Sequence, residues 1–269
     1  MTSLGVPHVG SAAERPLLSV AGLSIRFGGL LALDDVSFAV APRQICGLIG
    51  PNGAGKTTVF NCLSGIYRPS AGEIRFKDRA TLRVPSHRVA ALGIGRTFQN
   101  LALFPEMSVI DNVMVGGYCR TKTGFLGGML GTEAGRREEK ALAGRVNGIL
   151  DFFDLTSDAS RQVGDLPFGI QKRVEFARAL AGEPELLLLD EPAAGLNHHE
   201  VEALKAMILS VRERYRLAVL LVEHHMNLVM SVSDNVVALN FGRKIVDAPP
   251  AVAQEDRQLI AAYLGGGNE

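Results

Sequence analysis

The sequence predicts an α/β fold, in which a mostly parallel sheet is flanked by helices, with an antiparallel β unit near the N-terminus and a helical insertion. Three observations carry this prediction. Residues 17–40 alternate apolar and polar side chains. After residue 44, short apolar runs alternate with segments in which apolar residues have helical spacing. From about 85 to 182 the sequence pattern is mainly that of helices. The 269 residues suffice for one large domain, or for one domain with a subdomain.

The N-terminal part indicates strands around one helix. Residues 17–40 have the pattern of an antiparallel hairpin that turns at Gly28 and Gly29. The mostly apolar run 44–50 predicts a strand that ends in glycine, 57–67 has helical spacing, and 71–78 predicts another strand.

The remaining elements follow the same logic. Residues 108–117 and 137–155 carry apolar side chains at three- and four-residue spacing, and the glycine-rich stretch 121–135 between them predicts a loop or hinged insertion. The four leucines before Asp190 predict a strand buried on both faces. The elements expected after it are a helix over 199–215, a strand over 217–223, a helix over 225–233 and short strands over 235–246.

Composition gives no support to a nucleic-acid partner held by bulk charge, and it leaves open a local basic patch. Lysine plus arginine equals aspartate plus glutamate, at 28 each, so no bulk charge favours a nucleic-acid partner. Cys46, Cys62 and Cys119 match no metal or disulfide spacing, which favours a reducing compartment. No apolar run approaches 18 residues, so we expect no membrane span, and we interpret 1–16 and 265–269 as flexible tails.

A phosphate-binding motif spans residues 50–57. "GPNGAGKT" fits G-x-x-x-x-G-K-[ST] and lies between a predicted strand and a predicted helix, as the motif requires. Glycines let successive backbone N–H groups point inward, and the helix adds the positive end of its dipole. Lys56 supplies a charge for the β- and γ-phosphates, and the Thr57 hydroxyl can ligate Mg²⁺. We call residues 50–57 the phosphate cradle.

Two adjacent carboxylates end the leucine-rich strand. Asp190 and Glu191 repel each other, and an unpaired buried charge is costly, so something must compensate them. In a doubly wound sheet, ligands bind at the carboxyl ends of the strands, where the phosphate cradle also lies. Asp190 can hold Mg²⁺, and Glu191 can orient or deprotonate a water in line with the γ-phosphate. The alternative is a pair of solvated acids before a proline.

The spacing of further motifs resembles that of the ATP-binding cassette (ABC) family. A GTPase would usually carry an N-K-x-D motif that recognises guanine, and this sequence has none. The stretch "LPFGIQ" (166–171) is instead similar to the signature loop of the ABC family, and it stands at the expected distance before Asp190. The resemblance covers roughly 17–264. It implies one ABC ATPase domain over 17–264: a P-loop NTPase core, an N-terminal antiparallel β subdomain and an inserted helical subdomain at about 100–182.

The resemblance also assigns roles residue by residue. Phe27 matches the aromatic that stacks on adenine, Gln99 the lid-loop glutamine that contacts Mg²⁺ and the attacking water, and His224 the histidine that touches the γ-phosphate. Residues 194–197 match the loop after the acidic strand. The implied catalytic residues are Glu191, His224 and Gln99, and the implied Mg²⁺ ligands are Thr57, Gln99 and Asp190. The implied nucleotide-binding residues are Phe27, Gly50, Pro51, Asn52, Gly53, Ala54, Gly55, Lys56, Thr57 and Thr58.

The signature implies a second subunit. In the family, the signature helix end binds the γ-phosphate of ATP held by the other subunit, here through Phe168, Gly169, Ile170 and Gln171. Two positions depart from the family pattern. Pro167 replaces the signature serine and lacks a donor, so Gly169 and the helix dipole must supply more of the contact. His225 stands where aspartate is frequent, and we interpret His224 as the functional histidine.

The subfamily is indicated by weaker signals. Residues 95–116, the insertion after them and the ending "RQLIAAYLGG" resemble branched-chain amino acid importer ATPases, which implies ATP and Mg²⁺ as cofactors and import of such amino acids or related small polar solutes. The implied partners are a second ABC ATPase, polytopic permease subunits docking at about 100–130, and a periplasmic or extracellular binding protein, with no nucleic acid. The implied location is the cytoplasmic face of the inner membrane. Alternatives are a lipopolysaccharide-export ATPase and a soluble, non-transport ABC ATPase.

Overall fold

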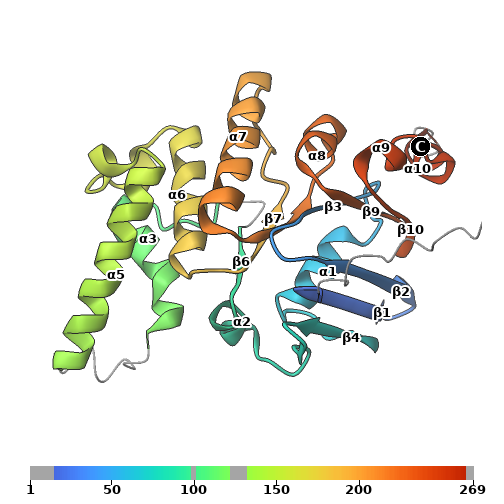
Figure 1. The fold of residues 1–269 in the computed structure, drawn as a ribbon, viewed down its shortest axis with the longest axis horizontal. Coiled ribbons are helices and arrows are strands. Elements are labelled where there is room, and N and C mark those ends of the chain that lie inside the picture. The colour runs from blue at the N-terminus through green and yellow to red at the C-terminus, as the bar shows by residue number, and fades with distance from the viewer. Residues whose placement is uncertain (1–14, 98–100, 122–131, 265–269) are drawn as a thin grey trace, which may run out of the picture.

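The computed structural model describes residues 15–97, 101–121 and 132–264 of the chain. Within these residues a six-stranded sheet, in the order β10-β9-β3-β8-β7-β6, lies over a four-stranded antiparallel sheet in the order β2-β1-β4-β5 (Figure 1). The strands are β1 (Leu18–Phe27), β2 (Leu30–Val40), β3 (Ile45–Ile49), β4 (Ala71–Phe76), β5 (Arg79–Ala80), β6 (Ile94–Arg96), β7 (Leu186–Asp190), β8 (Ala218–Val222), β9 (Asn235–Asn240) and β10 (Arg243–Ala248).

Helices cover the large sheet and extend beyond its β6 edge. Figure 1 shows α7 and α8 on one face, α1 between the two sheets, and α3, α5 and α6 packed together to one side. The helices are α1 (Lys56–Leu63), α2 (Ser86–Leu92), α3 (Val109–Gly117), α5 (Glu133–Phe152), α6 (Phe168–Ala181), α7 (His198–Tyr215), α8 (Met226–Val232), α9 (Pro250–Ala253) and α10 (Arg257–Leu264). No helix in the described ranges is both long and apolar enough to cross a bilayer.

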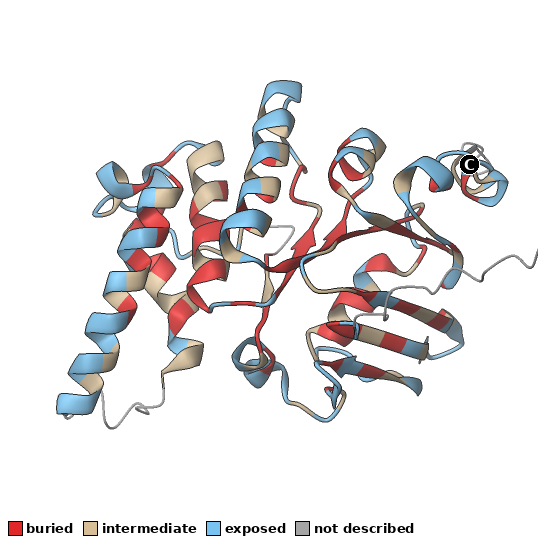
Figure 2. Cartoon of the chain, viewed as in Figure 1, coloured by how far each residue is buried: buried red, intermediate tan, exposed pale blue. Residues whose placement is uncertain are grey.

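The large sheet separates two hydrophobic cores. Because successive side chains of a strand point to opposite faces, Leu187 and Leu189 of β7 join the core beneath α3, α5, α6 and α7, whereas Leu186 and Leu188 join the core shared with α1 and the small sheet. The central strands are accordingly buried along their whole length (Figure 2). The prediction of a strand buried on both faces is therefore confirmed.

Two expectations about elements need correction. Residues 94–96 lie in the stretch predicted to be helical, but they form β6, which pairs in parallel with β7 through Ile94–Leu186 and Arg96–Leu188. The helix expected over 57–67 ends at Leu63. Two residues later, Gly65 takes a left-handed conformation with φ 69°, which does not continue a helix. After β10, residues 250–264 form α9 and α10, a stretch for which the sequence analysis makes no prediction. The glycine-rich loop predicted over 121–135 falls mostly on residues outside the described ranges.

Candidate nucleotide-binding and hydrolysis site

Three parallel strands bring the predicted site residues to one edge of the large sheet. β8 lies between β3 and β7 and pairs in parallel with both. The phosphate cradle follows β3, Asp190 ends β7, and His224 follows β8 after Glu223. The carboxyl ends of neighbouring parallel strands share an edge, so the topology places the cradle, the acids and the histidine together.

The backbone of the cradle requires glycine at two positions. Gly50 has φ 147°, and a Cβ there would lie 2.2 Å from the Leu239 carbonyl oxygen. Gly55 has φ 102°, and its Cβ would lie 2.6 Å from Leu33 Cδ2. No side chain caps the start of α1 at Gly55, so the first amides of the helix remain available to an anion together with the positive end of the dipole.

Lys56 is held inside the cradle. Its Nζ donates hydrogen bonds to the carbonyl oxygens of Gly50 at 2.7 Å and Pro51 at 2.9 Å, and the side chain is buried. Burial lowers the pKa of Lys56, while the negative charges of Glu191 and Asp190 oppose part of this shift. A phosphate would offer the ammonium group a charged partner in place of two carbonyls, which favours binding of an anion here.

Two distant segments support the cradle from outside. The Tyr263 hydroxyl, on α10, accepts a hydrogen bond from the Gly50 amide at 2.9 Å. The Gly242 amide, in the turn between β9 and β10, donates to the Ala54 carbonyl oxygen at 3.1 Å. No sequence motif predicts these two contacts, because Tyr263 and Gly242 lie far from the cradle in the sequence and reach it only through the tertiary fold.

A pocket of about 380 Å³ opens over the cradle. Phe27, Leu30 and Phe241 line it together with residues 52–58 and Glu191. Phe27 is 43% exposed, and its ring packs edge-on against Tyr67 with centroids 5.1 Å apart. The exposed apolar rings beside a phosphate-binding loop suit the purine and ribose of a nucleotide. Thr57 and Asn52 are exposed toward solvent, and Thr58 is half-buried.

Asp190 has a partner that the sequence interpretation missed. Its Oδ2 accepts a hydrogen bond from Arg96 Nη2 at 2.8 Å, in a pair whose side chains are 11% and 7% exposed. Arg96 Nη1 also donates to Asn61 Oδ1 at 3.0 Å and Ser64 Oγ at 2.9 Å, on α1 and at its end. The charge of Asp190 is thus compensated by an arginine 94 residues away in the sequence.

Glu191 lies in a different environment from Asp190. Its backbone has φ 47°, a left-handed conformation that ordinary residues seldom adopt, and its amide donates to the Val222 carbonyl oxygen at 2.9 Å. Its Oε2 lies 3.9 Å from His224 Nδ1. Unusual backbone conformations cluster at functional sites, and this one carries a carboxylate at the wall of the pocket above Lys56.

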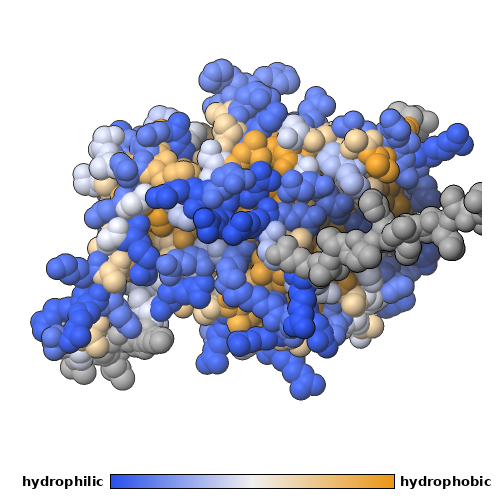
Figure 3. Space-filling model, viewed as in Figure 1, coloured by the Kyte–Doolittle hydropathy of each residue, from blue (hydrophilic) through white to orange (hydrophobic). Residues whose placement is uncertain are grey.

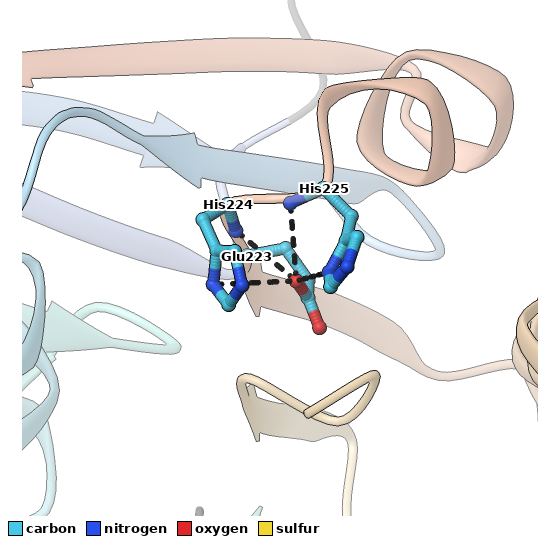
Figure 4. Close-up of side chains that lie close together, drawn as sticks. All are labelled: Glu223, His224 and His225. Atoms are coloured by element: carbon cyan, nitrogen blue, oxygen red, sulfur yellow. Dashed lines mark hydrogen bonds and ion pairs between the residues drawn. The ribbon is translucent and has the colours of Figure 1, made fainter. Parts of the chain in front are cut away.

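Glu223, which was not singled out from the sequence, connects two loops. It is fully buried, and its Oε1 accepts a hydrogen bond from the Ala193 amide at 2.7 Å, in the turn after Glu191. Its Oε2 accepts from the amides of His224 at 3.0 Å and His225 at 3.3 Å, and lies 3.2 Å from His225 Nδ1. Figure 4 shows both imidazole rings flanking this carboxylate.

The signature residues lie apart from the pocket over the cradle. Phe168 begins α6 and is 44% exposed, and Gly169 and Ile170 line a separate hollow between α6 and α7. Gln171 Nε2 donates to the Leu166 carbonyl oxygen at 2.8 Å. Pro167 contributes as a cap through its carbonyl oxygen, which accepts from the amides of Ile170 at 2.9 Å and Gln171 at 3.0 Å. Gln99 falls outside the described residues.

Fold and site together define a P-loop ATPase with a signature helix, and comparison with known proteins identifies its family. The ABC transporter family model matches residues 33–194. The chain therefore belongs to the ABC transporter family, as one of its ATP-hydrolysing subunits.

The chain is similar to curated transport ATPases over nearly its whole length. It is 45% identical over 252 residues to the high-affinity branched-chain amino acid transport ATP-binding protein BraF of Pseudomonas aeruginosa, covering 94% of this chain and 99% of that protein. It is 43% identical to the corresponding LivG of Escherichia coli K12, with the same coverage.

A solved ATP-binding cassette of an ABC transporter, MJ1267 in its ADP conformation, superposes with TM-score 0.81 at 26% identity, covering 93% of this chain and 99% of that one. The predictions of the family and fold class are confirmed.

Proposed function

We propose that the chain energises an importer of branched-chain amino acids or related small polar solutes. The observation that carries this proposal is the 43–45% identity, over 252 residues, to relatives whose names state that cargo. We further propose that residues 17–264 act as one ATPase domain, with about 100–182 as its helical subdomain and tails at 1–16 and 265–269.

The geometry supports a specific division of roles in hydrolysis. The amides of the phosphate cradle and Lys56 bind the β- and γ-phosphates, and Phe27 stacks on the adenine. Glu191 holds the attacking water and takes its proton as general base. His224, within 3.9 Å of Glu191, contacts the γ-phosphate and keeps the carboxylate oriented. Gln99 completes this set as the lid-loop ligand.

The residues at the cradle fit a bound Mg²⁺. A hydroxyl from Thr57 and a carboxylate from Asp190 are the hard oxygen donors that Mg²⁺ prefers, with Gln99 as the third proposed ligand. When bound, Mg²⁺ neutralises phosphate charge and polarises the γ-phosphoryl group. Arg96 holds one oxygen of Asp190 and thereby fixes the rotamer of the carboxylate.

A second ABC ATPase subunit completes the site. Gly169 and the start of α6 line a different hollow from the cradle, so in one chain the signature residues do not reach the nucleotide pocket. We propose that Phe168, Gly169, Ile170 and Gln171 of a facing subunit, identical or homologous, cover the γ-phosphate. Hydrolysis then separates the two subunits.

The permease docks at a mostly apolar groove of about 570 Å³. Ile66, Ala102, Phe104, Val115 and Cys119 line it, and Phe104 is 47% exposed. Leu101, Leu103 and Met107 are half-buried, and Leu103 packs against the hydrophobic core on the α6 side of the large sheet. We propose polytopic permease subunits at this groove on the cytoplasmic face of the inner membrane, and a binding protein acting on the same complex.

Co-purification and uptake test the proposal. The chain, isolated from its native membrane, should carry polytopic partners, and the reconstituted complex should take up radiolabelled leucine only with ATP and a binding protein. A matched complex with Glu191→Gln should bind the same partners without uptake. Uptake of an unrelated solute class, or export, would overturn the assigned cargo while leaving the ATPase activity established.

A further inference from the structure

Glu223, His224 and His225 form a cluster with the donor set of a transition-metal site. One ligand atom from each lies within 4.8 Å of the other two. Figure 4 shows that the two rings flank Glu223 Oε2 from opposite sides. His225 Nδ1 is 3.2 Å and His224 Nδ1 4.0 Å from this oxygen. Glu191 Oε2 is 3.9 Å from His224 Nδ1 and adds a second carboxylate.

These separations are close to those of a tetrahedral Zn²⁺ centre. Zinc binds imidazole nitrogen and carboxylate oxygen at about 2.0–2.2 Å, which places neighbouring ligands roughly 3.4 Å apart. The observed 3.2 Å is close to this value, whereas the 3.9 and 4.0 Å separations require the His224 ring, which is 49% exposed, to move by roughly half an ångström. Mg²⁺ and Ca²⁺ prefer all-oxygen sites, so two imidazoles select for zinc-like ions.

One ligand of the cluster is buried and held in place, and the other two are accessible to solvent. Glu223 is fully buried and held by the Ala193 amide, whereas the His224 and His225 side chains are 49% and 44% exposed. Both histidines directly follow Glu223 in the short link between β8 and α8, so the chain presents them beside the anchored carboxylate. A metal ion can therefore enter from solvent and meet a partly pre-arranged set of ligands.

We propose that Glu223, His224 and His225, with Glu191 as a further ligand, form an inhibitory binding site for Zn²⁺ or a similar borderline divalent ion. The ion bonds to Glu223 Oε2 and to imidazole nitrogens that carry no proton, and any proton on a bonding nitrogen is released to solvent. It thereby holds His224 and Glu191 away from the roles proposed for them in hydrolysis. The site rests on these side chains, and it is separate from the Mg²⁺ ligands Thr57 and Asp190.

Metal binding is measured first without nucleotide, on tag-free protein stripped with a chelator. Zn²⁺ affinity comes from competition with a chromogenic chelator, and Co²⁺ reports four-coordinate geometry through its visible d–d absorption. We expect one ion per chain, unaffected by millimolar Mg²⁺, and at least tenfold weaker binding in His225→Asn. His199→Asn is the matched control, because His198 and His199 are also adjacent and exposed but lie at the start of α7.

Two results would overturn the site: affinity unchanged in His225→Asn, or an equal loss in His199→Asn. Glu223→Gln, which keeps shape and the bond to Ala193, should weaken Zn²⁺ as strongly as His225→Asn if its fold is retained. Zn²⁺ should also inhibit ATP hydrolysis of the wild type at lower concentration than that of His225→Asn. Failure of Zn²⁺ to bind leaves basal ATPase activity intact and so does not touch the proposed function.

Discussion

Replacement of Arg96 by methionine tests the energetic role of the buried pair with Asp190. The substitution keeps an unbranched side chain of similar length but leaves Asp190, only 5% exposed, without its cationic partner at 2.8 Å. Removing one member of a buried ion pair costs about 3–5 kcal/mol because the remaining charge is uncompensated. The bonds to Asn61 and Ser64 are also lost, each contributing about 0.5–1.5 kcal/mol.

We therefore expect Arg96→Met to lower the free energy of unfolding by at least about 4 kcal/mol. At roughly 2–4 °C per kcal/mol for a chain of this size, the Tm should fall by about 8 °C or more. Urea denaturation without nucleotide, analysed at constant m value, measures the change. Arg161→Met is the matched control, since its bridge to Asp158 is as short, at 2.7 Å, but Arg161 is 53% exposed, and it should cost less than about 1 kcal/mol.

A double-mutant cycle separates the pair from general packing. Asp190→Asn removes the charge that Arg96→Met exposes, so the double variant should be at least about 2 kcal/mol more stable than the sum of the single effects. Additive single effects, or a loss in Arg96→Met no larger than in Arg161→Met, would refute the reasoning that the pair compensates Asp190.

Four further predictions concern the nucleotide pocket. Lys56→Ala should abolish tight ATP binding in a fluorescent-nucleotide assay, because it removes the charge inside the cradle. Glu191→Gln should retain ATP binding, slow hydrolysis by ~10²–10⁴-fold and leave an ATP-bound dimer on gel filtration. Phe27→Ala should weaken ATP binding by roughly 1–3 kcal/mol, with little change in turnover at saturation. Phe241→Gly should raise the free energy of unfolding by about 1 kcal/mol in denaturant melts, because φ 44° strains any residue with a Cβ.

Each of these has a clear contrary result. Unchanged ATP affinity in Lys56→Ala would show that Lys56 does not bind the phosphates. Full turnover of Glu191→Gln without an ATP-bound dimer would contradict the role of Glu191 as general base. A fall in saturated turnover at constant affinity would contradict stacking by Phe27. A Phe241→Gly chain less stable than the wild type would show that the exposed ring makes contacts worth more than the backbone strain.

Local patterns predicted most of the fold and the cradle. The run Leu186–Leu189 implied a doubly buried strand, and the glycines at 50, 53 and 55 implied a curled loop before a helix, because both features depend on neighbours in sequence. β6 escaped prediction because three residues between helical stretches are too short to show a period of two. The supports from Tyr263 and Gly242 escaped because they depend on tertiary contacts with the cradle.

The two adjacent acids coexist because the fold places them in different environments. Asp190 remains in the strand, where burial makes a partner necessary and Arg96 from the neighbouring strand supplies it. Glu191 leaves the strand through a left-handed conformation, so its carboxylate lies on the pocket wall near His224 instead of beside Asp190 in the core. Local sequence shows that the charge of Asp190 needs a partner, but it does not show which residue supplies one. The partner, Arg96, is set by the order of the strands in the sheet, and its strand, β6, is too short at three residues to be recognised from the sequence.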